Sequence, residues 1–270
     1  MNLLLIGGDK RQVIIKNNLE KSGFSVDHIC YNADLNNDFS RYDAIIFPLP
    51  TTRDGVFVTN SLSGDKIKIS DISSKITEQT VLCGNYSFDN FLYYDYGKDE
   101  ATTILNAVPT AEGAIAIAIN NTSFTLWKSK CLVVGYGKIG KALSSRLKNL
   151  GSYVTVSARR DTDFAFIDVN GYRAVKTNDI IETANEYDII FNTVPTPVLP
   201  RNVLKKCHKD CLLIELSSPP YGIDLKAAEE LGLNVIMAGG LPGKVAPKTA
   251  ADILSSSIIK FLNQESNTKR

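Results

Sequence analysis

Short apolar runs alternate with helical patterns along almost the whole chain, and this alternation limits the folds open to it. Runs this short and this apolar are typical of buried parallel strands. The helical segments between them indicate βαβ units. We therefore expect an α/β fold with two doubly wound, Rossmann-like domains, each with a parallel sheet, joined by interdomain helices. The expected strands are Leu3–Ile6, Ser25–Cys30, Ala44–Phe47, Val81–Cys83, Cys131–Val134, Val154–Ser157, Asp188–Asn192, Leu212–Leu216 and Asn234–Met237.

Two helices are expected to join the domains. Thr110–Asn120 is rich in Ala and Ile, and Thr110 is the expected N-cap. Ala250–Asn263 is the expected C-terminal helix. The predicted domains are residues 1–120 for substrate binding, residues 121–245 for NADP binding, and residues 246–270 as a helix packing back on the first domain. The other expected helices are Lys10–Ser22, Lys138–Leu150, Asn178–Glu186, Pro200–Cys207 and Leu225–Leu231.

Length and charge narrow the class of protein. The 270 residues predict about two domains. The chain has 30 Lys+Arg against 29 Asp+Glu, which argues against nucleic-acid binding. No apolar run reaches the roughly 18 to 20 residues of a membrane span, and the N-terminus does not resemble a signal peptide. Five scattered cysteines indicate a reducing cytoplasm. Cys207, His208 and Cys211 supply too few ligands for zinc, so no metal is expected.

A glycine-rich turn follows the expected strand Cys131–Val134 and opens a helix. Its sequence is G-Y-G-K-I-G, in the context of a dinucleotide-binding fingerprint. In such a turn the first glycine permits the tight bend, the second lets the backbone approach a pyrophosphate, and the third allows close packing of helix on strand. A glycine-rich turn without a ligand is the alternative. The predicted cofactor-binding residues here are Gly135, Tyr136, Gly137, Lys138, Ile139 and Gly140.

The end of the next strand indicates which dinucleotide binds. NAD-binding proteins usually carry Asp or Glu there, to bind the ribose 2′-hydroxyl. Ala158 stands at that position, followed by Arg159 and Arg160. Two arginines, with the Ser157 hydroxyl as a further donor, would attract a 2′-phosphate, so the expected cofactor is NADP. The alternative is that both arginines are solvated surface residues.

Two further loops follow strands at the sheet edge where ligands bind in open α/β sheets. The first contains Thr193, Val194 and Pro195, and the second contains Ser217. We expect both near the nicotinamide half of the cofactor. Ordinary turns at strand ends are the alternative.

Several segments together resemble one family. They are Gly7-Gly8-Asp9 with Arg11-Gln12, V-P-T-A-E-G at 108–113, the glycine-rich turn, S-A-R-R at 157–160, N-T-V-P at 192–195, and G-L-P-G-K-V-A-P-K-T-A at 240–250. In this order they resemble the A-type subunit of dipicolinate synthase from spore-forming Firmicutes. The resemblance implies an NADP-dependent oxidoreductase that makes dipicolinic acid with a flavoprotein-like B-type subunit of dipicolinate synthase. It also implies synthesis in the mother-cell cytoplasm during sporulation.

The implied reaction allows candidate residues to be named. Aromatising a dihydropyridine dicarboxylate removes a hydride and a proton from the ring, and two carboxylates need cationic or N–H partners. Glu112 is the candidate proton acceptor and Lys244 a second catalytic candidate. A homo-oligomer is expected. The candidates for binding a small dicarboxylate substrate are Arg11, Arg53, Thr110 and Lys248.

Two alternatives stay open. One is another NADP-dependent dehydrogenase, of the 2-hydroxyacid or methylene-tetrahydrofolate type. The 2-hydroxyacid type usually needs a late histidine, and this chain has only His28 and His208. The other is a non-catalytic regulator that binds NADP. The scarcity of histidine favours ring dehydrogenation over alcohol oxidation, because no hydroxyl proton has to be removed.

Overall fold

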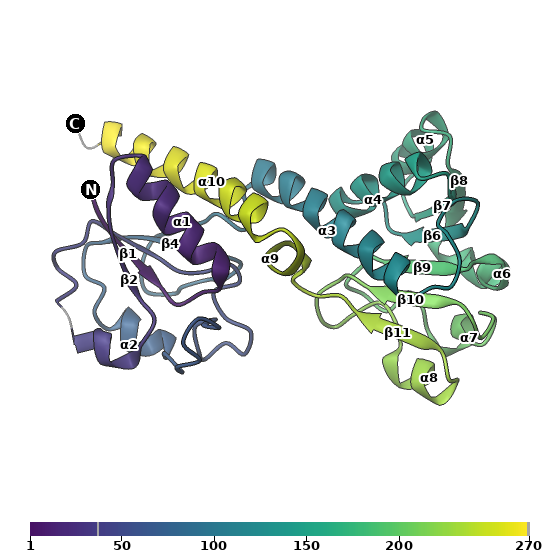
Figure 1. The fold of residues 1–270 in the computed structure, drawn as a ribbon, viewed down its shortest axis with the longest axis horizontal. Coiled ribbons are helices and arrows are strands. Elements are labelled where there is room, and N and C mark those ends of the chain that lie inside the picture. Colours follow the sequence, from purple (N-terminus) through teal and green to yellow (C-terminus); the bar gives the residue numbers. More distant parts are fainter. Residues whose placement is uncertain (37, 269–270) are drawn as a thin grey trace. The chain divides into compact units, whose positions relative to one another are not determined.

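The chain forms two compact units (Figure 1). The computed structural model describes residues 1–36 and 38–268. Unit 1 comprises Met1–Asn106 and Pro242–Arg270, and unit 2 comprises Ala107–Leu241. The boundaries expected from the sequence lie after residues 120 and 245, so most of the Ala/Ile-rich helix belongs to unit 2 rather than to the first domain.

Unit 1 is built on a five-stranded parallel sheet with the order β2-β1-β3-β4-β5. This is the flavodoxin-like doubly wound order, in which the direction of winding switches between β1 and β3. The strands are β1 (Asn2–Ile6), β2 (Ser25–Ile29), β3 (Ala44–Ile46), β4 (Thr80–Cys83) and β5 (Tyr93–Asp95). The helices are α1 (Lys10–Lys21), η1 (Asn32–Asn36), α2 (Ile69–Ser73), α9 (Leu241–Val245), which starts at the boundary, and α10 (Pro247–Thr268).

Alternate residues of β1 face opposite layers of unit 1. Leu3 and Leu5 pack in one core with residues of α1 and α10. Leu4 and Ile6 pack in the other core, which includes Ile69 of α2. Both faces of the sheet are therefore covered, which explains why its strands are apolar almost throughout. Figure 1 shows α10 lying alongside α1, and Asn18 of α1 donates to Asp252 of α10 at 2.9 Å.

Unit 2 is built on a six-stranded parallel sheet with the order β11-β10-β9-β6-β7-β8. This is the Rossmann strand order, and its switch point lies between β6 and β9. The strands are β6 (Lys130–Val134), β7 (Tyr153–Ala158), β8 (Arg173–Lys176), β9 (Ile189–Asn192), β10 (Leu212–Glu215) and β11 (Asn234–Met237). The helices are α4 (Lys138–Asn149), α5 (Asp161–Val169), η2 (Thr177–Asp179), α6 (Ile180–Thr183), η3 (Ala184–Glu186), α7 (Arg201–Leu204) and α8 (Leu225–Glu230).

The helix α3 (Glu100–Asn120) corrects one prediction. It begins ten residues before Thr110, and Asp99 caps it by accepting from Thr102 N at 2.8 Å. Thr110 is therefore inside the helix and is not its N-cap. The helix continues through Pro109, which removes one backbone donor. The sequence indicated a helix start at Thr110 because Thr is a residue type that favours the N-cap.

By length and composition α3 could cross a membrane. Its apolar content has another explanation in the fold. Ala111, Ala114 and Ala118 are fully buried in the core of unit 2. Small side chains on this face let the helix pack closely against the sheet layer.

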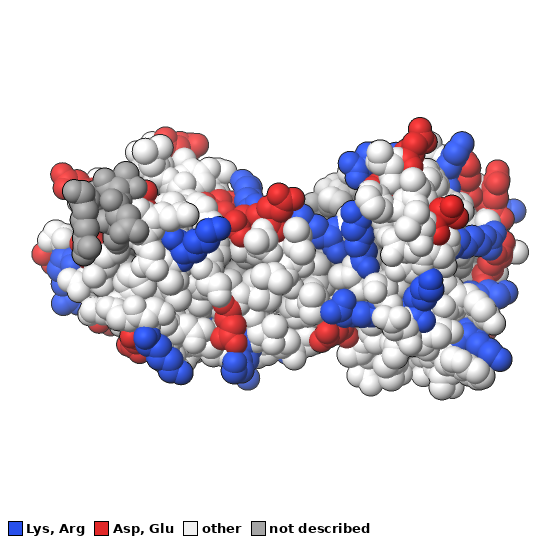
Figure 2. Space-filling view, turned by 90° about the horizontal axis from the view of Figure 1, so that it is seen from above, with Lys and Arg blue, Asp and Glu red and all other residues white. Residues whose placement is uncertain are grey.

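The fold class is the one expected: two Rossmann-like α/β sheets, each parallel and doubly wound. The sequence did not predict β8, α2, α5, α9 or the short η1. The Tyr-rich segment Tyr93–Tyr96 was expected to form a strand and to pack in the core, and its residues Tyr93–Asp95 form β5. Figure 2 shows Lys and Arg interspersed with Asp and Glu on the face in view, in keeping with a formal net charge of +1. The five cysteines are free thiols.

Candidate functional site

The glycine-rich turn lies at the switch point of unit 2, between β6 and α4. Gly135 has φ +95°, and a Cβ there would lie 2.6 Å from Val194 Cγ2. A Cβ on Gly140 would lie 2.1 Å from the Gly135 carbonyl oxygen. Neither position can hold a larger residue without displacing its surroundings. The turn therefore has the close packing that the fingerprint requires.

The N-terminus of α4 is open to a ligand. Gly137 occupies the N-cap and makes no side-chain cap hydrogen bond. A Cβ built on Gly137 would meet nothing within 4 Å. The first backbone N–H groups of a helix have no partner inside the helix, and the helix dipole favours an anion beside them. The turn thus fits a dinucleotide pyrophosphate.

The remaining residues of the turn support it from inside. Tyr136 is 7% exposed and packs edge-on against Tyr172, with the ring centroids 6.3 Å apart. Ile139 is partly buried against the same core. Lys138 is exposed at the first position of α4. Tyr136 and Ile139 therefore contribute backbone to the turn, while their side chains anchor it.

Ser157 does not have the role predicted for it. The side chain is fully buried, so it cannot reach a 2′-phosphate. Its hydroxyl oxygen accepts from Gly135 N at 3.3 Å, and its carbonyl oxygen accepts from the same N–H at 3.1 Å. Ser157 holds the first glycine of the turn against the end of β7.

The two arginines after β7 differ in their surroundings. Arg160 forms a two-pronged ion pair with Asp163 of α5, at 2.8 and 2.9 Å. The hydrogen bonds and charge of Arg160 hold the pKa of the Asp163 carboxyl below its usual value, although burial opposes this. Arg159 is exposed and has no ion-pair partner in the described part of the chain. Arg159 is therefore the arginine available to a ligand phosphate.

The loops after β9 and β10 lie beside the turn. The Thr193 hydroxyl donates to the Val134 carbonyl at 2.8 Å, which ties the β9 loop to the end of β6. Val194 lies against Gly135, and Pro195 is exposed. Ser217 is 9% exposed, and its hydroxyl donates to Glu215 at 2.7 Å. The structure thus brings Thr193 and Val194 to the turn.

The switch point of unit 1 has a different turn. Asp9 is the N-cap of α1 and accepts from Arg11 N at 2.9 Å. The Arg11 guanidinium donates to both Asp9 carboxylate oxygens, at 2.7 to 3.2 Å, and to the Leu49 carbonyl at 2.6 Å. The Arg11 side chain is only 12% exposed. Arg11 is therefore already bound to a carboxylate of the chain itself.

Further positive groups gather around Asp9. Burial raises the pKa of the Asp9 carboxyl, but the hydrogen bonds and charge of Arg11 and the charge of Arg53 outweigh it and leave the pKa below its usual value. A Cβ on Gly243 would lie 2.9 Å from Arg11 Nε, so the chain immediately before Lys244 lies against this pair. Arg53 and Lys244 are both outside the buried core. Arg11 and Arg53 thus bring two positive charges to Asp9 at the carboxyl ends of β1 and β3.

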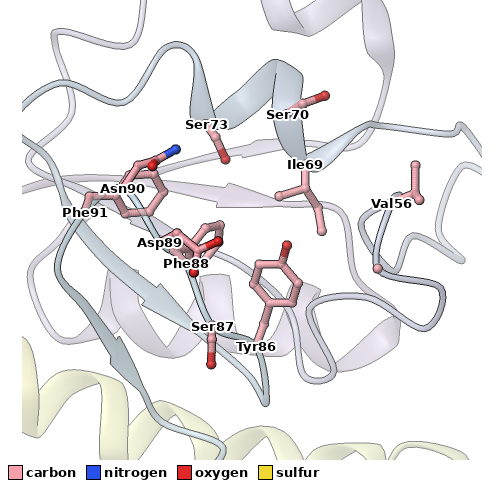
Figure 3. A pocket seen from close by; sticks show the side chains of 11 residues that line it. Val56, Ile69, Ser70, Ser73, Tyr86, Ser87, Phe88, Asp89, Asn90 and Phe91 are labelled. Carbon is pink, nitrogen blue, oxygen red and sulfur yellow. The ribbon is translucent and has the colours of Figure 1, made fainter.

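A separate cavity of about 340 Å³ lies in unit 1 (Figure 3). Ile69, Ser70 and Ser73 of α2 form one side, and the segment 86–91 forms another. Its lining residues include no Lys or Arg in the part of the chain that the structure describes, and they do include Asp89. The negative charge of Asp89, with no cation among the lining residues described, makes the cavity unsuited to a dicarboxylate.

Comparisons with known proteins agree with this geometry. Residues 2–91 match the family model of the N-terminal domain of the A-type subunit of dipicolinate synthase. Residues 130–219 match the model described as NADP oxidoreductase, coenzyme F420-dependent. The chain is 32% identical to the A-type dipicolinate synthase subunit of Bacillus subtilis, covering 97% of this chain and 96% of that protein. The chain belongs to the family of A-type dipicolinate synthase subunits.

Solved structures of this family share the fold over nearly the whole chain. The crystal structure of the A-type dipicolinate synthase subunit from Bacillus halodurans is 28% identical, covers 97% of each chain and has a TM-score of 0.90. The structure from Bacillus subtilis is 27% identical, covers 99% of this chain and 97% of that one, and has a TM-score of 0.89. This member of the family is thus an α/β protein of the oxidoreductase type with a nicotinamide-cofactor domain.

Three candidate residues of this family member are buried or paired within the chain itself. Thr110 is 9% exposed inside α3, so most of its surface is closed to a substrate. Lys248 pairs with Asp252 one turn along α10, at 2.8 Å. Glu112 contacts Arg146 at 3.4 Å. Because Arg146 lies about 12 Å along α4 from its first residue, Glu112 is beside the second half of α4 and away from the glycine-rich turn.

Two functional candidates were missed in the sequence. Asn192 and Glu215 end β9 and β10, lie opposite each other in register, and are both fully buried. Each polar side chain ends an otherwise apolar run, at the edge of the sheet that binds ligands. A polar residue at the end of an apolar strand run is the sequence signal that could have identified both residues.

Proposed function

We propose that this chain is an NADP-dependent dehydrogenase that forms dipicolinic acid from a dihydrodipicolinate-type intermediate. It acts together with a flavoprotein-like B-type subunit, in the mother-cell cytoplasm during sporulation. The family supports this proposal, because both the identity and the fold extend over nearly the whole chain. The observation that carries it is the open N-terminus of α4 at the switch point of unit 2.

Arg159 supports NADP rather than NAD. It is exposed at the end of β7, where a dinucleotide-binding protein contacts the adenosine ribose. No acid occupies the strand end, because Ala158 stands there. A guanidinium without an ion-pair partner can bind a 2′-phosphate with charge-assisted hydrogen bonds. Arg160 is less available, because it already holds Asp163.

Unit 1 supports binding of a small dicarboxylate. Arg11 and Arg53 place more positive charge beside Asp9 than it neutralises, and the exposed Lys244 follows Gly243, which packs against Arg11. Arg11 keeps Asp9 and the Leu49 carbonyl in place, which leaves Arg53 and Lys244 as the accessible partners for substrate carboxylates. The proposal therefore assigns substrate binding to Arg53 and Lys244, with Arg11 as their support.

The chemistry follows from the two sets of residues. The nicotinamide ring supplies a hydride acceptor when the cofactor is bound. One C–H hydride leaves the dihydropyridine ring, a second ring atom releases a proton, and the ring becomes aromatic. The chain's own groups hold the phosphates at α4 and the carboxylates at the turn of unit 1. Because aromatisation is strongly favourable, orienting the ring can supply much of the rate enhancement.

The test is direct turnover. Purified protein receives dihydrodipicolinate and NADP, with and without the B-type subunit, and NADPH absorbance is followed. Absorbance should rise in at least one mixture and should need the dihydropyridine substrate. No signal in either mixture, from protein of native circular dichroism, would contradict the proposal. Replacing NADP with NAD in the active mixture tests the cofactor assignment.

Oxidation of a 2-hydroxyacid is the alternative activity. It needs a base for the hydroxyl proton, usually histidine. His28 bonds the Gly7 carbonyl at 2.7 Å, and burial lowers its pKa. His208 lies just before β10, at the opposite end of that strand from the nicotinamide-side loops. These positions favour ring dehydrogenation. Turnover of small 2-hydroxyacids with NADP, without turnover of dihydrodipicolinate, would reverse that preference.

A further inference from the structure

Glu215 is a buried carboxylate in unit 2 that the proposed chemistry does not use. It ends β10 and has no solvent exposure. Oε1 accepts from Asn192 Nδ2 at 2.7 Å, and from Ser217 N and Oγ at 2.9 and 2.7 Å. Oε2 accepts from Gly222 N and Ile223 N, both at 3.0 Å. These five contacts all come from donors, which is the pattern of an ionised carboxylate.

The group is held without a cation. In the described residues Glu215 forms no ion pair, so backbone and side-chain donors alone stabilise its charge. A buried charge of this kind is costly unless it is fully hydrogen-bonded. Its donors come from three separate stretches of chain: the end of β9, the start of the β10 loop, and residues 222–223. The arrangement therefore fixes these stretches to one another.

The network extends to the glycine-rich turn. Asn192 Nδ2 also donates to the Val194 carbonyl at 3.0 Å, and Val194 N donates to Asn192 Oδ1 at 3.2 Å. Val194 in turn fills the space in which a Cβ on Gly135 would lie. Gly222 packs as closely, because a Cβ there would lie 2.3 Å from Asn192 Nδ2. A continuous set of contacts thus joins Glu215 to the first glycine of the turn.

We propose that Glu215 is a positioning residue that holds the β9 and β10 loops in the geometry that binds the nicotinamide half of the cofactor. This rests on the proposed function, since it needs the cofactor to bind along the carboxyl ends of β6, β9 and β10. The adenosine half would bind at Arg159 and the N-terminus of α4, and the contacts of Glu215 reach this region only through Val194 against Gly135. Loss of the carboxylate should therefore weaken binding of one half of the dinucleotide and spare the other.

Glu215→Gln is the informative substitution. It keeps the shape but replaces one acceptor oxygen with an NH₂ group, which must then face N–H or O–H donors. We expect the affinity for NADP to fall by about tenfold or more, because a buried donor is left unpaired. The affinity for adenosine 2′,5′-bisphosphate, which lacks the nicotinamide half, should stay within about threefold. Isothermal titration calorimetry measures both.

Two further variants separate positioning from stability. Ser217→Ala removes one donor and keeps the carboxylate. We expect its NADP affinity to fall by less than in Glu215→Gln, and its affinity for the bisphosphate to stay unchanged. It serves as the test if Glu215→Gln does not fold. Tyr187→Phe is the matched control, because it removes a buried hydroxyl bonded to Thr183 at 2.9 Å just before β9 begins. It should lower the melting temperature without changing either affinity.

The outcomes are distinguishable. Equal losses for both ligands in Glu215→Gln, or no loss for NADP in a folded variant, would overturn the positioning role. If Glu215→Gln does not fold, an unchanged NADP affinity in Ser217→Ala would overturn the positioning role instead. If the wild-type protein binds neither ligand, the proposed function itself fails. Separate loss of NADP affinity, with the bisphosphate unaffected, supports the assignment.

Discussion

In unit 1 the turn after the first strand caps its helix with a carboxylate from the chain itself, whereas in unit 2 the corresponding turn leaves its helix uncapped. Asp9 accepts from the first turn of α1 and is held by Arg11. Gly137 has no side chain to offer α4. Both turns lie at the switch point of a parallel sheet, where ligands usually bind.

The difference separates two ways of using a helix N-terminus. In unit 1 the N–H groups and the dipole stabilise an internal carboxylate, and Arg53 is an exposed cation near it. In unit 2 the N–H groups themselves are left for a ligand phosphate. Both switch points have a doubly wound strand order, so the residue at the N-cap is what distinguishes the turn that we propose to bind the dinucleotide.

The largest effect is expected from giving unit 2 the cap of unit 1. Gly137→Asp places a carboxylate at a position with φ −76° and open space, so folding is not strained. The new cap should stabilise the protein by a few tenths of a kcal/mol to about 1 kcal/mol, since Gly is itself a tolerated N-cap, while NADP affinity falls by about 100-fold or more. Thermal melting and calorimetric titration give the two values.

Gly137→Asn is the matched control, because it caps the same N–H groups without charge. It should lose less affinity than the Asp variant. Full NADP affinity in Gly137→Asp would show that the α4 N-terminus is not the phosphate site, and the contrast between the units would lose its functional meaning.

A smaller effect is expected at the arginines after β7. Arg159→Ala should lower NADP affinity by about 10- to 100-fold and leave NAD affinity nearly unchanged, because a charge-assisted contact to phosphate is lost. Arg160→Ala should change NADP affinity less, since Arg160 is bound to Asp163. Dissociation constants for both cofactors test this. Equal effects of the two substitutions would contradict the distinction drawn between them.

Asp9→Asn tests the internal carboxylate of unit 1. Arg11 would keep its charge in a site where its side chain is 12% exposed, so stability at pH 7 should fall by about 1–3 kcal/mol. Because the folded-state pKa of Asp9 is below its ordinary 3.8, its contribution is present above that pH and is lost as pH falls through the folded pKa. Urea unfolding should show that the difference in unfolding free energy between the wild type and Asp9→Asn is smaller at pH 3 than at pH 7. A difference that is constant with pH would rule out the ion pair as its source.

The smallest effect is expected at Glu112. Its carboxylate is 59% exposed and contacts Arg146 at 3.4 Å, away from the open helix terminus. Glu112→Gln should change stability by less than about 1 kcal/mol and keep turnover within about threefold. Steady-state assay with dihydrodipicolinate measures it. A large loss of kcat in a native fold would restore Glu112 as the proton acceptor.

Local and periodic features could be predicted from the sequence. The apolar strands of both sheets and the glycine-rich turn are of this kind, because burial on both faces leaves a continuous apolar run. The strand β8 was missed since its residues Arg173–Lys176 are mostly exposed at the sheet edge. The true start of α3 was missed because Thr110 is a favourable N-cap type before the Ala/Ile-rich run, whereas Asp99 caps the helix. The roles of Ser157 and Glu215 depend on which backbone donors the tertiary structure brings to them.

The burial of Ala158 has an evolutionary consequence. This residue stands where NAD-binding proteins place an acid, but it is 4% exposed, and its carbonyl accepts from the Thr177 hydroxyl at 3.1 Å. An acid introduced there would enter the interior before it met any ligand. Arg159, by contrast, is exposed, so replacing it would disturb no core packing. If Arg159 binds the 2′-phosphate as proposed, a change of cofactor preference could begin with this surface residue, and a full reversal would require the strand end to be repacked.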